Sequence, residues 1–353
     1  MNTNEFHFYE SKTCFCEFKS INNIFCFVYI LNRESALVFY DITKKKIINK
    51  NVVNKNGGII KITDIRHHLD KKFKRDLILH NNMYNNEIYI WDFNNWQKLT
   101  QIYGVNTSGA LYSTCFYEIN DIIYILTTNI SWEGKNGNIK VFDLQGSRIK
   151  EIPNSNERAI FIDTYYDSNF DKNFIVTCND KGRINIYDFQ NNALFKKYDD
   201  NDPNYQFLIN DFVVDEREPI KKLIGSCYKA HIKIWDFYNG NLLKRIMFNY
   251  DGIYDLYGLC LFNYNYLLVG TNEINDNNNY NYNDKACILL IDLNQGKVIK
   301  KIKAHTSQVK FIKFINSEYG KILVSGGLYS DIIFWENKEF EFNIIDRINN
   351  QAF

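Results

Sequence analysis

One short pattern recurs along the whole chain of 353 residues, and it limits the folds that the chain can adopt. Each copy is an apolar run that ends in an aromatic or large aliphatic residue followed by an acidic residue, here called an anchor pair. The seven anchor pairs are Tyr40-Asp41, Trp91-Asp92, Phe142-Asp143, Tyr187-Asp188, Trp235-Asp236, Ile291-Asp292 and Trp335-Glu336. They follow one another at intervals of roughly 50 residues, and a repeat of that length predicts an array of similar small units.

Apolar runs on both sides of the anchor pairs predict about four short β-strands in each repeat. Runs such as NFIVTCN and KILVSGG precede the last four anchor pairs, and runs such as LLKRIMF and VIKKIK follow them. Alternating runs of this length between turn residues are typical of strands. The prolines at 153, 203 and 219 lie where strands are expected to end, because proline lacks the N–H that a sheet needs.

The last repeat, residues 304–337, is the most regular copy. The order and spacing of His305, Ser325 and Trp335 in it resemble a WD-repeat of the β-propeller family. In that family a His, a Ser or Thr, an Asp and the anchor Trp form a buried hydrogen-bonded set, although Tyr329 stands here where the Asp is expected. The resemblance implies structural roles for His305, Ser325 and Trp335, and for the other repeat tryptophans, Trp91 and Trp235.

The resemblance covers essentially the whole chain and implies its architecture. We expect an all-β fold, a seven-bladed β-propeller of four-stranded blades, which forms a single WD-repeat domain over residues 1–353. Two segments compete to supply the last outer strand. Residues 342–348 have the register of a fourth strand, and residues 6–9 are the alternative; we favour the C-terminal segment.

Composition excludes several classes of protein. The 42 Lys and Arg residues nearly balance the 41 Asp and Glu residues, so no general attraction to a polyanion is predicted. The N-terminus is not typical of a signal peptide, and the longest apolar run, residues 24–31, is too short to span a bilayer. We expect a soluble intracellular protein, cytoplasmic rather than nuclear, whose eight cysteines are mostly buried thiols and which holds no metal or cofactor.

Two insertions fall on one face if the chain is a WD-repeat propeller. Residues 129–138 contain Trp132, and residues 272–285 are rich in Asn and contain Tyr280 and Tyr282. An exposed Trp in a Gly- and Asn-rich loop is typical of an interface anchor, so we predict partner contacts here. The alternative is a solvated low-complexity loop.

The opposite face is expected to carry two basic segments on adjacent blades. One, Lys44, Lys45 and Lys46, is expected between the third and fourth strands of the first repeat. The other, residues 67–76, is expected to be the loop that joins the first and second strands of the second repeat, and it contains Lys71, Lys72, Lys74 and Arg75. Together they predict a basic patch that binds an acidic protein surface, an anionic lipid head group or nucleic acid. Nucleic acid is the least favoured partner, because only Phe73 is available for stacking on bases. The alternative is a pair of solvated lysine-rich turns.

No sequence pattern of an enzyme is present: there is no nucleophile elbow, phosphate-binding glycine loop or zinc-protease motif. We therefore expect a non-catalytic scaffold or adaptor that binds other proteins within an intracellular complex. The first alternative is a reader of a peptide or a modified residue at the channel mouth. The second is a propeller enzyme whose site is built from scattered side chains.

Overall fold

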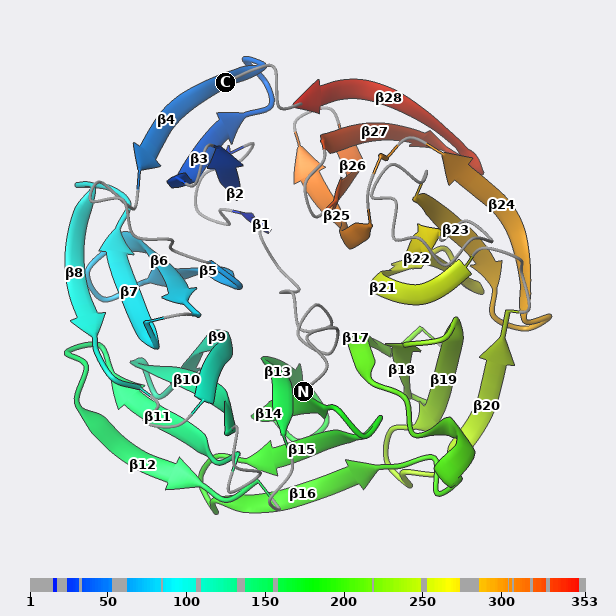
Figure 1. Cartoon of the computed structure of the whole chain (residues 1–353), viewed down its shortest axis with the longest axis horizontal. Helices are drawn as coiled ribbons and strands as arrows, with labels where there is room; N and C mark the ends of the chain where they lie inside the picture. Colours follow the sequence, from blue (N-terminus) through cyan, green and yellow to red (C-terminus); the bar gives the residue numbers. More distant parts are fainter. Residues whose placement is uncertain are drawn as a thin grey trace, which may run out of the picture. The chain divides into compact units, whose positions relative to one another are not determined.

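The computed structural model of the chain describes residues 15–17, 24–31, 34–52, 62–83, 85–105, 109–131, 137–154, 158–217, 219–248, 253–273, 286–303, 305–306, 308–317, 320–327 and 331–348. In these ranges the backbone forms 28 β-strands and one 3-10 helix, Pro203–Tyr205. Figure 1 shows that four consecutive strands make up each of seven antiparallel sheets. The expected fold class is confirmed: the chain is all-β, a seven-bladed β-propeller of four-stranded blades.

The strands divide between two compact units. The first unit contains four sheets, whose last strand ends at the boundary between the units. Their strands are β1 (Phe15–Glu17), β2 (Ile24–Leu31), β3 (Glu34–Asp41) and β4 (Lys46–Val52); β5 (Ile65–Asp70), β6 (Arg75–Asn82), β7 (Glu87–Asp92) and β8 (Gln97–Ile102); β9 (Gly109–Ile119), β10 (Ile122–Ser131), β11 (Ile139–Asp143) and β12 (Arg148–Ile152); and β13 (Ala159–Asp167), β14 (Lys172–Asn179), β15 (Ile184–Asp188) and β16 (Ala193–Tyr198).

The second unit contains three sheets with the same order of strands. Their strands are β17 (Ile209–Asp215), β18 (Lys222–Cys227), β19 (His231–Asp236) and β20 (Leu242–Met247); β21 (Ile253–Phe262), β22 (Tyr266–Glu273), β23 (Cys287–Asp292) and β24 (Lys297–Lys303); and β25 (Val309–Ser317), β26 (Gly320–Gly327), β27 (Ile332–Lys338) and β28 (Glu341–Ile348). The C-terminal run therefore forms the fourth strand of the seventh sheet, paired with β27, as favoured from the sequence. Residues 6–9, the alternative, lie outside the described residues.

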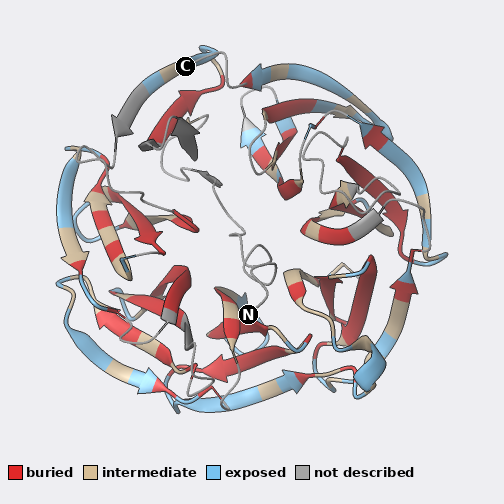
Figure 2. Ribbon diagram, viewed as in Figure 1, coloured by how far each residue is buried: buried red, intermediate tan, exposed pale blue. Residues whose placement is uncertain are grey.

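Where burial is described, the third strands are mostly buried, and the fourth strands are mostly exposed or half-buried. Every residue of β15 and of β23 is buried, whereas β16 and β24 are exposed over most of their length. Figure 2 shows this contrast as red third strands and pale blue fourth strands. Apolar side chains of the second and third strands thus supply most of the core, which is the main source of stability. The described part of the chain holds no helix long and apolar enough to cross a membrane.

The sequence places residues 67–76 in a loop, and this expectation is wrong for most of the segment. Strand β5 continues to Asp70 and β6 begins at Arg75, so only residues 71–74 form the turn. The two histidines are accommodated in a strand because each lies close to a carboxylate. His67 Nε2 lies 2.6 Å from Asp76 Oδ1, and His68 Nε2 lies 3.3 Å from Glu118 Oε2. The two histidines have different partners, so they do not form a chelating pair.

The aromatic or aliphatic member of the anchor pair marks a β-bulge. In every sheet for which the pairing of third and fourth strands is described residue by residue, the register shifts immediately before this residue. The six residues are Tyr40, Trp91, Phe142, Trp235, Ile291 and Trp335. A bulge bends the strand and increases its twist, so the repeated sequence pattern corresponds to a repeated bend.

The acidic member of the anchor pair closes the turn between the third and fourth strands. Its carboxylate accepts a hydrogen bond from a backbone N–H two to four residues further on, at 2.8–3.0 Å. This bond is made by Asp41, Asp92, Asp143, Asp188, Asp236 and Asp292. Such side-chain bonds to the backbone are the reason that Asp is favoured in turns. The recurrence of the acid is thus explained by turn geometry.

In the seventh sheet, a buried hydrogen-bonded set ties the preceding crossover to the blade. His305 Nε2 lies 2.7 Å from Ser325 Oγ, and Trp335 Nε1 donates to the same oxygen at 2.8 Å. All three side chains are buried. Burial, together with the charge of Arg347, lowers the pKa of His305 to about 3, so the imidazole is neutral at physiological pH. Residue Tyr329 lies outside the described residues.

Three other sheets fix the preceding crossover with different groups on the third strand. In the fifth sheet Trp235 Nε1 donates to Asp199 O at 3.1 Å, and in the fourth the hydroxyl of Tyr187 donates to Asn154 Oδ1. In the third sheet the ammonium group of Lys140 donates to Val105 O. Each bond joins a side chain of the third strand to the chain segment that enters the sheet, which fixes where the first strand begins.

The second sheet lacks this bond among the described residues. His80 occupies the register position of Ser325, and its ring stacks on Tyr89 at 4.8 Å and on Trp91 at 6.3 Å. Trp91 Nε1 and both ring nitrogens of His80 are buried and bond to no described residue. Burial lowers the pKa of His80 to about 4. The indole of Trp91 therefore contributes through packing, whereas that of Trp335 also contributes a hydrogen bond.

This difference predicts unequal effects of the same substitution. Trp335→Phe is expected to lower the free energy of unfolding by about 1 kcal/mol more than Trp91→Phe, because it also removes a donor to a buried oxygen. Thermal and denaturant unfolding of the two variants measure the difference. Equal losses would contradict a stabilising role for the indole bond to Ser325.

The neutral state of His305 predicts a pH dependence. The folded-state pKa lies below the unfolded value of 6.5, so the unfolded chain takes up a proton first and stability falls as pH drops from 6.5 towards 3. His305→Ala should therefore cost about 2 kcal/mol less at pH 5 than at pH 7.5, relative to the wild-type protein. Ser325→Ala, which keeps the imidazole, is the control: its cost should not change with pH in this range.

Candidate partner-binding site

The turn between β5 and β6 carries the predicted basic residues and has a fixed shape. The buried carboxylate of Asp70 accepts a hydrogen bond from Phe73 N at 3.2 Å and from Arg75 Nε at 2.9 Å. Lys74 has a φ of 50°, in the left-handed region, which reverses the chain. The turn therefore holds its lysines outward: Lys71, Lys72 and Lys74 are exposed.

Phe73 lies at the tip of this turn with 62% of its surface exposed. The guanidinium of Arg75 lies 4.9 Å from its ring centroid, and Lys72 Nζ lies 5.5 Å from it. Cations attracted to an aromatic face in this way hold the ring in place in water. Arg75, which also pairs with Asp70, thus has a structural role in addition to its charge.

A second turn, residues 93–96 between β7 and β8, supplies apolar side chains next to the first. Trp96 has a φ of 54° and lies with its ring 4.6 Å from that of Phe93 and 4.6 Å from that of Phe39 in β3. Phe93 and Phe39 are buried, and Trp96 is half-buried. The turn between β7 and β8 is thus anchored on the neighbouring sheet.

Backbone and side-chain bonds connect the two turns. Asn94 Nδ2 donates to Lys74 O at 3.3 Å, Asp76 N donates to Asn94 Oδ1 at 3.3 Å, and Phe93 N donates to Asp76 O at 2.8 Å. These bonds give the two turns a single arrangement.

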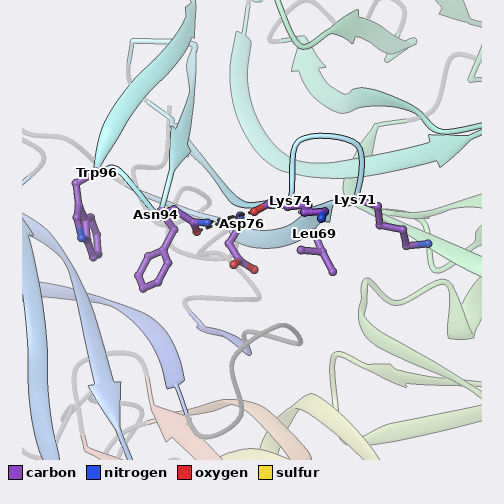
Figure 3. A pocket seen from close by; sticks show the side chains of 7 residues that line it. Leu69, Lys71, Lys74, Asp76, Asn94 and Trp96 are labelled. Carbon is purple, nitrogen blue, oxygen red and sulfur yellow. Dashed lines mark hydrogen bonds between the residues drawn. The ribbon is translucent and has the colours of Figure 1, made fainter.

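A pocket of about 580 Å³ lies between the two turns. Its lining residues are Leu69, Lys71, Lys74, Asp76, Phe93, Asn94 and Trp96. Figure 3 shows Trp96 and Asn94 on one side, Lys71 on the other, and Asp76 and Leu69 between them. Two of the predicted basic residues therefore meet apolar side chains in one concave site.

The charge of the pocket is positive. Lys71 and Lys74 form no ion pair with any residue that the structure describes, whereas the buried Asp76 is bound by His67. The other predicted lysines are placed differently. Lys44, Lys45 and Lys46 are exposed at the turn between β3 and β4, Lys44 pairs with Asp41 at 2.9 Å, and none of the three lines the pocket.

The predicted contacts on the opposite face, Trp132, Tyr280 and Tyr282, lie outside the described residues. Sequence reasoning instead missed Trp96, Phe93 and Leu69. The one available signal was a second Trp five residues after Trp91, in the polar turn sequence NNW, where no core position is expected.

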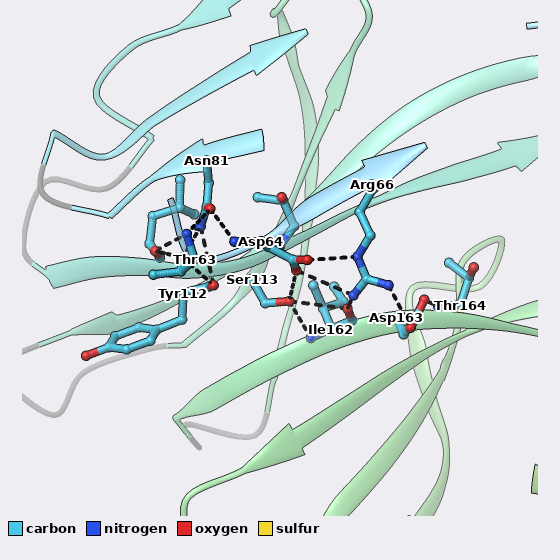
Figure 4. Close-up of polar contacts among 11 residues, drawn as sticks. Thr63, Asp64, Arg66, Asn81, Tyr112, Ser113, Ile162, Asp163 and Thr164 are labelled. Atoms are coloured by element: carbon cyan, nitrogen blue, oxygen red, sulfur yellow. Dashed lines mark hydrogen bonds and ion pairs between the residues drawn. The ribbon is translucent and has the colours of Figure 1, made fainter. Parts of the chain in front are cut away.

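A second polar cluster joins the first strands of three consecutive sheets in the first unit (Figure 4). Arg66 on β5 pairs with Asp64 at 3.0 Å and with Asp163 on β13 at 2.9 Å. Ser113 on β9 donates to Asp64 Oδ2 at 2.7 Å. Burial would lower the pKa of Arg66, but the carboxylates of Asp163 and Asp64 raise it above its ordinary value. The guanidinium is therefore occupied by its partners, and the cluster has a structural role.

Potential metal ligands are dispersed among the described residues, and three of the thiols are shielded from water. No group of three or more His, Cys, Asp or Glu in the described part of the chain could hold a metal ion. Burial raises the pKa of Cys115 well above its ordinary value, that of Cys227 to about 12 and that of Cys260 to about 11, so these thiols stay protonated.

Comparison with known proteins yields similarity in fold alone. No protein-family model matches the sequence, and no curated protein matches it. The crystal structure of the computationally designed Ika8 protein is similar, with a TM-score of 0.59 and 14% sequence identity over 96% of this chain and 87% of that chain. In all, 1287 chains of solved structures match, so the fold by itself does not single out a function.

The cluster around Arg66 predicts a large effect on stability. Arg66→Ala removes a guanidinium that pairs with two carboxylates, one of them on Asp64, whose side chain is only 1% exposed. It should lower the free energy of unfolding by about 3–5 kcal/mol. The control is Arg148→Ala, which breaks the exposed pair with Glu151 and should cost less than about 1 kcal/mol. Thermal unfolding of both variants measures the contrast, and similar losses would show that the buried cluster is dispensable.

Proposed function

We propose that this chain is a WD-repeat β-propeller that serves as a non-catalytic scaffold or adaptor within an intracellular multiprotein complex. The family assignment is supported by the seven anchor pairs, by the turn-closing role of six of their acids, and by the bonded set of His305, Ser325 and Trp335. An intracellular location is supported by the six cysteines whose side chains the structure describes, because all six are free thiols, as expected in a reducing compartment.

One observation carries the interaction role: the pocket where Lys71 and Lys74 stand unpaired beside Trp96 and Phe93. Most charged side chains on a protein surface are simply hydrated. A concave site in which cations lie beside aromatic rings has the composition of a binding site. Phe73, exposed at the same turn, adds an aromatic contact of the type enriched in interfaces.

The proposal predicts that partner binding depends on these lysines. The double variant Lys71→Glu/Lys74→Glu should recover about tenfold less partner protein than the wild-type chain in affinity purification with crosslinking mass spectrometry. The difference should shrink in high salt, because exposed charges are screened. Thermal stability should stay unchanged, since both side chains are exposed and unpaired.

The matched control is Lys297→Glu/Lys303→Glu, which makes the same change of net charge on exposed residues of β24. If both double variants recover the same partners in the same amounts as the wild-type chain, the pocket is not the interaction site.

A further inference from the structure

We propose that the pocket between residues 71–74 and 93–96 binds a short acidic segment of a partner protein, with one large apolar side chain of that segment seated against Trp96. This inference rests on the proposed interaction function and adds the chemistry of the partner. It follows from the apolar lining, the unpaired charges, and the size and rigidity of the pocket.

The apolar lining calls for an apolar side chain in the partner. Leu69, Phe93 and Trp96 line the pocket together, and the indole of Trp96 is held in place by its contacts with Phe93 and Phe39. Covering such a surface removes apolar area from water and is favourable at about 25 cal/mol for each Å². A partner that was only charged would leave this area exposed.

The unpaired charges of Lys71 and Lys74 favour carboxylates next to the apolar side chain of the partner segment. Lys71 and Lys74 have no ion-pair partner among the described residues, and the carboxylate of Asp76 is already bound by His67 at 2.6 Å. Lys72 and Arg75 lie on the same turn around Phe73, so further positive charge surrounds the pocket. An acidic segment would satisfy both lysines, whereas a basic one would be repelled.

The size and rigidity of the pocket favour a short segment. A volume of about 580 Å³ accommodates a few side chains and is within the range of sites that enclose small ligands. The bonds of Asn94 to Lys74 and Asp76 fix the two turns before any partner arrives. Little conformational entropy is then lost on binding, which allows a short peptide to bind measurably.

Single-stranded nucleic acid is the competing partner for a basic site with aromatic rings. Nucleic acid binding of this kind relies on open aromatic faces that stack on successive bases. Trp96 is half-buried and packed on two other rings, so among the aromatic residues of the two turns only Phe73 is exposed. The described residues therefore favour a peptide.

The test uses the full chain and a fluorescent peptide of about ten residues with glutamates on both sides of one phenylalanine, in the manner of short linear motifs. Anisotropy should show binding that weakens about tenfold when the glutamates are changed to glutamines, and about tenfold when the phenylalanine is changed to serine. Lys71→Glu/Lys74→Glu should abolish binding, and Lys297→Glu/Lys303→Glu should not.

A photoreactive analogue at the phenylalanine position locates the bound side chain. Crosslinks to Leu69, Phe93 or Trp96 support the proposal. It is overturned if the crosslinks lie only elsewhere, if the glutamine peptide binds equally well, or if a thymidine oligonucleotide of similar length binds more tightly than the acidic peptide.

The two proposals fail in different ways. Loss of cellular partners in Lys71→Glu/Lys74→Glu without any binding of the acidic peptide would overturn the peptide proposal and leave the interaction function standing. Peptide binding that depends on both lysines, with cellular partners unaffected by the variant, would support the pocket's chemistry and overturn the proposed interaction function.

Discussion

Buried or half-buried polar groups on several third strands need hydrogen-bond partners, and the rest of the structure depends on how this requirement is met. In four sheets the partner comes from the crossover that enters the sheet: an Asn side chain, two backbone carbonyls, or the His305–Ser325 pair. Because an unsatisfied buried group is costly, each crossover is held in one position. Tyrosine, tryptophan and lysine can each donate this hydrogen bond to the crossover. The repeats can therefore differ in sequence and still make the bond.

Much of the fold could be predicted from the sequence, because its signals are local. Alternating runs predict strands, and an Asp whose carboxylate closes the turn two to four residues further on recurs in six repeats. The cluster around Arg66 could not be predicted in this way. Its partner Asp163 lies 97 residues away, and no pattern within one repeat indicates that β5 and β13 approach the same guanidinium. The pocket could not be predicted from the sequence for a similar reason, since its lining comes from two separate turns that Asn94 joins.

Fewer cations of the basic patch are available to a partner than the number of its lysines and arginines suggests. Lys44 and Arg75 each pair with an aspartate at the base of their own turn, and Arg75 also covers the ring of Phe73. Their charge is therefore partly compensated within the chain. Lys71 and Lys74 retain theirs beside an apolar surface, which turns a general attraction into a specific site. Local pairing, which sequence alone does not report, decides which cations are available.

The exposed fourth strands have a consequence for behaviour at high concentration. Each is the edge of its sheet, with backbone groups that another chain could pair with. Several also expose apolar residues, among them Ile149, Phe195 and Ile299. Yet the same strands carry cations between them, as in RIKEI, ALFKKY and KVIKKIK. Bringing two such edges together would bury like charges side by side, so these lysines protect the protein from aggregation by strand addition.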